Sequence, residues 1–93
     1  MTIEDLLAEA RKIWGTKKMS LEEIVIACGV IVGDLHRYTR DKNEGKTVDK
    51  DELKKELGNI IFSTVRWCDD LGYDPEDCIE LARQAQVDYQ NRN

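Results

Sequence analysis

Apolar residues recur every three or four positions along most of this chain, which is the spacing of residues on one face of an α-helix. The short runs of β-branched residues lie inside longer stretches that keep this spacing. The pattern predicts four helices, at residues 3–14, 21 to about 40, 50–71 and 75 to about 89. Because these segments cover most of the chain, the expected fold class is all-α.

Each predicted helix begins after a residue whose side chain can cap it. Ser20 and Glu23 have the spacing of a capping box, in which two side chains satisfy backbone N–H groups of the first turn. Glycine follows the first and third helices, where it suits the left-handed conformation that ends a helix. The predicted N-caps are Thr2, Ser20, Asp49 and Asp74, the predicted stops are Gly15 and Gly72, and the main loop is 43–48.

The second and third helices carry apolar residues on more than one face. In the second helix, Ile26, Ala27 and Val30 widen the main apolar stripe, which makes this helix the expected centre of the fold. A chain of 93 residues forms a single domain, residues 1–93, whose modest core cannot cover so much apolar surface. We therefore expect a four-helix bundle that completes its core by oligomerisation, as a homodimer or homotetramer.

The same pattern assigns the faces of the third helix. Phe62, Val65 and Trp67 are expected on a second apolar surface, outside the main core-facing stripe. Each cysteine falls on an apolar stripe, so Cys28, Cys68 and Cys78 are interpreted as core thiols. The residues expected to face the core are Leu53, Leu57, Ile60, Ile61, Thr64, Cys68 and Leu71.

Charge and hydropathy narrow the range of partners. The formal net charge of −5 argues against a nucleic-acid partner, because a protein that follows a phosphate backbone needs a concentrated basic face. No apolar run approaches the length of a membrane-spanning helix, and we recognise no signal peptide. We expect no membrane association and a cytoplasmic location.

A line of polar side chains interrupts the apolar pattern of the third helix. Glu56 and Asn59 are three residues apart, so they lie one above the other on one helix face, where both can reach a single cation or phosphate. Ser63 and Arg66 continue this line. Arg66 has two interpretations, a phosphate contact or an ion-pair partner of Glu56 or Asp70, and the ion pair is the commoner arrangement.

The segment 56–77, which begins E-L-G-N-I-I-F and ends D-D-L-G-Y-D-P-E-D, resembles the MazG-like all-α nucleotide pyrophosphohydrolases. The order of elements is similar over nearly the whole chain. The resemblance implies that an E-x-x-E motif on the long helix and an E-x-x-D motif on the next helix hold Mg²⁺. The metal binds the phosphates of a nucleoside triphosphate, which water cleaves to a monophosphate and pyrophosphate. Mg²⁺ suits this role because it shares its oxygen ligands between protein and phosphate.

Carried onto this chain, the resemblance makes Glu56 both the catalytic residue and a metal ligand. Asn59 occupies the position of the second acid, where it is a weaker ligand and a substrate contact. Ser63 and Arg66, on the same stripe, are the other expected substrate contacts.

The family's first motif is matched here to Ala27 and Val30, so three of the four expected carboxylates are missing. Glu23 and Asp34 lie one turn before and one turn after that pair and are the candidate replacement ligands. At about 1.5 Å per residue they are roughly 16 Å apart along the helix. At most one of them can join Glu56 on a single weakly held Mg²⁺.

Two functions are therefore open from the sequence. The first is a MazG-like protein that binds nucleoside triphosphates and hydrolyses them with weakened metal dependence. The second is a non-catalytic oligomeric helical module that has lost the metal centre and acts through protein partners. The two differ in whether enough negative charge remains to hold a divalent ion.

Overall fold

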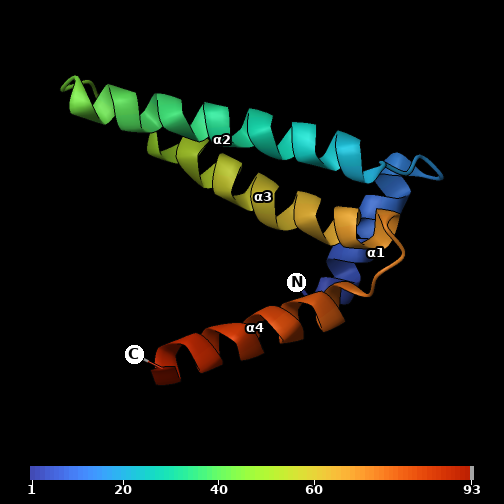
Figure 1. Cartoon of the computed structure of the whole chain (residues 1–93). Helices are drawn as coiled ribbons and strands as arrows, with labels where there is room; N and C mark the ends of the chain where they lie inside the picture. The colour runs from blue at the N-terminus through green and yellow to red at the C-terminus, as the bar shows by residue number, and fades with distance from the viewer. Residues whose placement is uncertain (93) are drawn as a thin grey trace.

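The computed structural model describes residues 1–92, and within them the chain forms four α-helices and no strand (Figure 1). The helices are α1 (Ile3–Trp14), α2 (Leu21–Asn43), α3 (Lys50–Asp70) and α4 (Pro75–Arg92). The prediction of an all-α chain is confirmed. Over the described residues, no helix combines the length with the hydrophobicity that crossing a lipid bilayer requires.

The predicted N-caps form at the starts of the helices. Ser20 Oγ accepts the backbone N–H of Glu23 at 3.2 Å, and the Glu23 carboxylate accepts the N–H of Ser20 at 3.1 Å. A second capping box, not predicted, joins Thr2 and Asp5 at 3.0 Å in each direction. Asp49 Oδ1 accepts two N–H groups from the first turn of α3. Local side-chain chemistry thus fixes where the helices begin.

The central helix is α3, and α1, α2 and α4 each pack against it. In Figure 1, α2 and α3 form an antiparallel hairpin, α1 lies beside the C-terminal part of α3, and α4 diverges from the hairpin. The expectation that the second helix is central was therefore wrong. α2 carries apolar residues on several faces, but neighbouring helices do not cover all of these faces.

Few side chains are fully removed from solvent. The buried apolar residues, 2–8 % exposed, are Ala10, Ile24, Tyr38, Val65 and Trp67. Because the apolar core is small, polar contacts between the helices contribute a larger share to holding the helices in position.

The face assignment for α3 was wrong in part. Val65 and Trp67, expected on the secondary surface, are buried, whereas Leu57 and Ile61, expected in the core, are 49 % and 60 % exposed. Cys28, interpreted as a core thiol, is also exposed. The reason is that α1 and α2 cover other sides of α3 than the one that carries Leu57 and Ile61.

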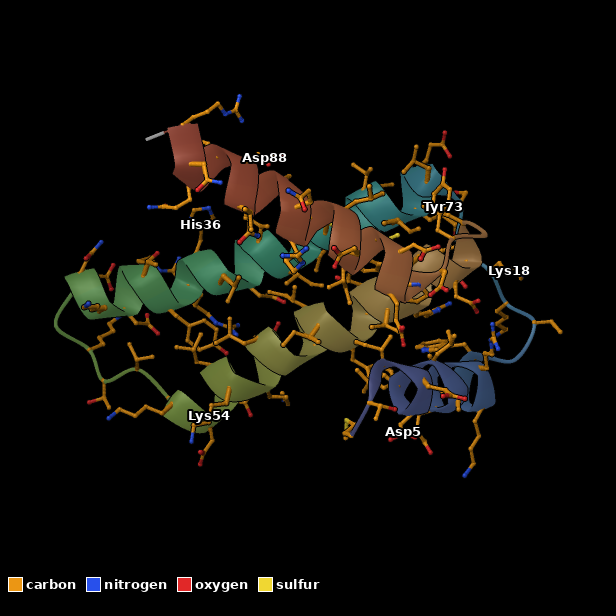
Figure 2. All side chains as sticks on the ribbon, turned by 90° about the horizontal axis from the view of Figure 1, so that it is seen from below. Asp5, Lys18, His36, Lys54, Tyr73 and Asp88 are labelled. Carbon is orange, nitrogen blue, oxygen red and sulfur yellow. The ribbon has the colours of Figure 1, made fainter. Side chains whose placement is uncertain are left out.

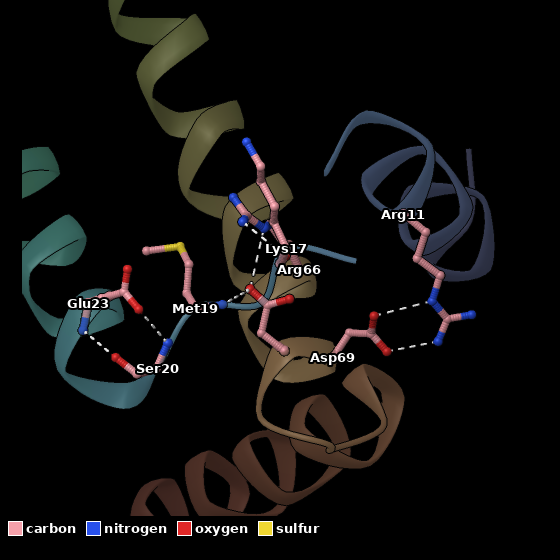
Figure 3. Close-up of polar contacts among 8 residues, drawn as sticks. Arg11, Lys17, Met19, Ser20, Glu23, Arg66 and Asp69 are labelled. Atoms are coloured by element: carbon pink, nitrogen blue, oxygen red, sulfur yellow. Dashed lines mark hydrogen bonds and ion pairs between the residues drawn. The ribbon is translucent and has the colours of Figure 1, made fainter. Parts of the chain in front are cut away.

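Arg66 and Asp70, one turn apart on α3, form an ion pair at 3.3 Å with side chains only 12 % and 6 % exposed. Asp70 also accepts the backbone N–H of Met19 at 3.1 Å. The Arg66 guanidinium stacks 4.0 Å from the ring centroid of Trp14 and donates to the carbonyl of Lys17 at 3.5 Å. We call these five residues the Arg66 cluster, and Figure 3 shows its polar contacts.

The Arg66 cluster joins the end of α1, the connection 15–20 and α3 at one point. Each charged group in it has an opposite charge or a polar partner, which offsets the desolvation of a nearly buried ion pair. Beside it, Arg11 of α1 donates two hydrogen bonds to the Asp69 carboxylate, at 2.8 and 3.2 Å. These bonds lower the pKa of Asp69 below its usual value. The two Arg–Asp pairs, Arg66–Asp70 and Arg11–Asp69, therefore stabilise the packing of α1 against α3.

We predict that Asp70→Ala lowers the free energy of unfolding by about 3 kcal/mol, because it leaves the nearly buried Arg66 without its counter-charge and removes the acceptor of the Met19 N–H. Urea unfolding followed by circular dichroism measures this. The matched control is Asp88→Ala on α4, whose carboxylate accepts a bond from the exposed Gln84. A loss below about 1 kcal/mol, the range of exposed pairs, would show that the Arg66 cluster does not organise the fold.

Candidate functional site

The side of α2 that faces α3 is the side whose residues are least exposed to solvent. Half-buried or buried residues recur along α2 at three- and four-residue spacing, while the positions between them are exposed. This stripe contains Tyr38 and, one turn earlier, the carboxylate of Asp34. α3 is the helix that covers α2, so the stripe is the surface of α2 that points to α3. Its members are Ile24, Ala27, Ile31, Asp34, Leu35, Tyr38 and Asp41.

A stripe of buried and partly buried residues at helical spacing also runs along α3. Glu56 and Ser63 belong to it, and both are partly buried. Asn59 lies at its edge and is exposed. The stripe consists of Leu53, Glu56, Ile60, Ser63, Trp67 and Asp70. Glu56 is therefore a carboxylate on the inner side of the hairpin and not on its outer surface.

One electrostatic pair near each end of the hairpin indicates its approximate register. Near the loop, Lys55 interacts electrostatically with Tyr38. At the other end, Glu23 interacts electrostatically with Arg66. Because antiparallel helices have the same rise, each residue toward the start of α2 corresponds to one residue toward the end of α3. Counting from either end places Asp34 level with the turn 55–59.

This register brings some predicted site residues together and separates others. By this count Asp34 and Glu56 lie within about one helical turn of each other along the hairpin. Ala27, the position matched to the first missing acid, lies about two turns further along, level with 62–66. Glu23 lies at the far end of the hairpin, where its carboxylate caps the N–H of Ser20. Of the two proposed replacement acids, Asp34 and not Glu23 is placed to act with Glu56.

Asn59 and Ser63 form a polar pair next to Glu56. The Ser63 hydroxyl donates to Asn59 Oδ1 at 3.1 Å. This bond occupies one lone pair of the amide oxygen and leaves the other free, together with the amide N–H donors. The pair can thus offer both an acceptor and donors to a bound phosphate or its metal.

Arg66 is not available as a phosphate ligand. Its guanidinium is held by Asp70, Trp14 and the Lys17 carbonyl. The ion pair with Asp70, the commoner of the two interpretations of this residue, is confirmed. His36 is exposed on α2, and Figure 2 shows His36 and Lys54 projecting to opposite sides of the hairpin.

Two residues near the acidic pair were not singled out from the sequence. The hydroxyl of Tyr38 is buried between the helices, and interaction with it raises the pKa of the adjacent Arg37. The pKa of Lys55 is raised, chiefly by its bond to Glu52 and to a smaller degree by Glu56 and Tyr38. The sequence did contain a signal for the burial of Tyr38, because this residue continues the apolar stripe of Ile31 and Leu35 at helical spacing.

The donor set is suited to a hard divalent cation. Asp34, Glu56, Asn59 and Ser63 offer only oxygen ligands or amide donors, which fits Mg²⁺ whose remaining ligands are phosphate and water. Within residues 1–92, three or more acidic, histidine or cysteine side chains do not gather around any point in a way that could hold a metal ion. An ion bound by these residues would take its other ligands from phosphate and water.

No protein-family model matches this chain, and neither a curated protein nor a solved structure is significantly similar to it.

Proposed function

We propose that this chain binds a nucleoside triphosphate together with Mg²⁺ between α2 and α3, in the manner of a MazG-like nucleotide pyrophosphohydrolase. The proposal is supported by two partly buried carboxylates, Asp34 on α2 and Glu56 on α3, that the hairpin register brings within about one helical turn of each other. A divalent cation between these two carboxylates would be attracted to both negative charges. The polar pair Asn59 and Ser63 extends the same surface.

Each residue has a distinct task in this proposal. Glu56 and Asp34 supply the two negative charges that neutralise a divalent ion, and a metal held there withdraws electron density from the bound phosphates. Asn59 donates its amide N–H groups to a phosphate oxygen, while Ser63 fixes the orientation of that amide. The Arg66 cluster acts indirectly, by holding the end of α3 and with it the register of the hairpin.

Hydrolysis, when it occurs, is expected to be slow. Asp34 and Glu56 carry a charge of −2, against the −4 that two complete acidic motifs would supply. A single ion can neutralise phosphate charge, but the second ion of a two-metal site lacks ligands here. Binding without fast turnover is the outcome that this charge favours.

We predict that a triphosphate with a methylene group in place of the α,β-bridging oxygen binds in the presence of Mg²⁺. Isothermal titration calorimetry measures this with each of the four common bases. Glu56→Gln and Asp34→Asn should each weaken binding at least about tenfold, because each removes one of two charges on the metal. Asn59→Asp should strengthen it.

The matched control is Glu9→Gln, which removes one charge from the exposed surface of α1. Equal weakening by this variant would mean that only net charge matters. No heat of binding with any base, or binding that is unchanged in Glu56→Gln, would contradict the proposed site. Release of pyrophosphate from the natural triphosphates, measured in parallel, separates binding from turnover.

A second candidate function, a non-catalytic oligomeric module, is favoured by a different observation. Several apolar side chains on one side of the hairpin are about half exposed or more: Leu21, Val25 and Val32 on α2, and Leu57 and Ile61 on α3. We call these five residues the apolar strip. Such a continuous surface is typical of a contact between protein chains. Self-association through it is compatible with both functions, since the acidic pair lies on another face.

We predict that the protein is a dimer or tetramer in solution and that Val25→Glu shifts it toward the 10.7 kDa monomer. A charge in the apolar strip must lose its hydration when two copies meet, which opposes assembly. Light scattering coupled to size-exclusion chromatography measures the mass. Ala8→Glu, on the exposed side of α1, is the control. A wild-type protein that stays monomeric at its highest soluble concentration would contradict assembly through this strip.

A further inference from the structure

The inner side of α4 meets α3 at a groove that plays no part in the proposed nucleotide site. Its volume is about 350 Å³, and its walls are apolar residues of α1, α3 and α4, including Ile3, Ile61 and Ile79. Cys68 of α3 and Cys78 of α4 both line it. Each of the two thiols is only partly buried, so a small reagent in the groove can reach them.

The turn between the helices holds these two cysteines in position. The N–H of Tyr73 donates to the carbonyl of Cys68 at 2.9 Å, and Gly72 in the left-handed region (φ 83°) lets the chain reverse there. Asp74 caps the first turn of α4 through the N–H of Glu76 at 2.9 Å. Since this turn is fixed by hydrogen bonds at both ends, the start of α4 lies beside the last turns of α3 before any covalent link exists.

The two thiols line the same groove, and the side chain of Cys78 influences that of Cys68. Burial raises the pKa of Cys68 to about 11, and the interaction with Cys78 adds to this shift. At neutral pH Cys68 is therefore almost entirely a thiol, and the pair reacts slowly unless the pH rises or the oxidant is efficient.

We propose that Cys68 and Cys78 are a modification site, a dithiol that a hydroperoxide or a low-molecular-weight disulfide oxidises to a disulfide linking α3 to α4. With a hydroperoxide, one thiolate attacks the terminal oxygen, forming a sulfenic acid and releasing an alcohol. The second thiol attacks the sulfenic sulfur, forms the S–S bond and releases water. Two electrons and two protons leave the pair, and the hydroperoxide is reduced.

The disulfide changes how firmly α4 is attached. Pro75 is the one buried residue of α4, and the apolar side chains Leu81 and Tyr89 further along are largely exposed. A covalent link in the first turns of α4 removes the open states in which the helix leaves α3, which closes the groove more persistently. Cys28 is exposed on α2 and takes no part in this reaction.

Diamide, an azo compound that accepts two electrons and two protons from a dithiol, tests this on the full chain under native conditions. Mass spectrometry should show a loss of about 2 mass units and a peptide cross-linked between Cys68 and Cys78, while Cys28 is still alkylated. The reaction should be faster at pH 9 than at pH 7. Backbone amides of residues 76–82 should exchange roughly tenfold more slowly after oxidation.

Three variants serve as controls. Cys28→Ser should form the same cross-link at the same rate, whereas Cys68→Ser and Cys78→Ser should form no disulfide within the chain. The proposal is overturned if the main product links Cys28 between chains, or if the Cys68–Cys78 bond forms only after unfolding in urea. Unchanged amide exchange in the oxidised protein would overturn the attachment of α4 as its consequence.

Discussion

Arg66 and Asp70 form an ion pair that is almost sealed from solvent, and the contacts that fix α1 and α2 relative to α3 converge on it. The pair contacts the ring of Trp14, the carbonyl of Lys17 and the N–H of Met19. An isolated buried ion pair adds little stability because both charges lose their hydration. Here each charge also has polar or aromatic partners from another segment. Together these contacts set the position at which the chain enters α2.

That position determines the register of the hairpin and hence what faces Glu56. Because α2 begins beside the last turns of α3, Asp34 lies within about one turn of Glu56 and Asn59 along the hairpin. A shift of one helical turn, about 5.4 Å, would put Ile31 or Tyr38 at that level and leave Glu56 without a facing acid. The small apolar core resists such a shift only weakly. The Arg66 cluster, at one end of the hairpin, is therefore the main restraint on the geometry of the candidate site in its middle.

Local signals in the sequence were sufficient to predict where each helix begins. They were not sufficient to predict which helices pack against each other. Thr2, Ser20 and Asp49 each act through side-chain bonds to the following turn, so their caps could be predicted from a few residues. The face of α3 that is buried depends instead on which helices cover it. Leu57 and Ile61 have the same helical spacing as core residues, yet α1 and α2 lie elsewhere, so only coordinates could place Val65 and Trp67 in the core.

The residues of the candidate site also fall into two groups, those that the sequence alone predicts and those that depend on how the helices pack. Glu56, Asn59 and Ser63 were predicted because their spacing alone puts them on one helix face. Asp34 and Glu23 were equivalent in the sequence, since each lies one turn from the matched motif, and only the antiparallel register distinguishes them. Arg66 had two plausible partners, and the nearly buried setting of Asp70 decided between a structural and a ligand-binding role. Tyr38 lay within the predicted helix, but the burial of its hydroxyl depends on the packing around α2.

The pairing of Asp34 with Glu56 is tested most directly by paramagnetic Mn²⁺, which replaces Mg²⁺ and broadens nearby NMR signals. In the presence of the non-hydrolysable triphosphate, the backbone amide signals around residues 34 and 56–59 should broaden first and together. They should do so much less in Asp70→Ala, where the register is no longer held. Broadening centred on the acids of loop 43–49, or at only one of the two helices, would contradict the account.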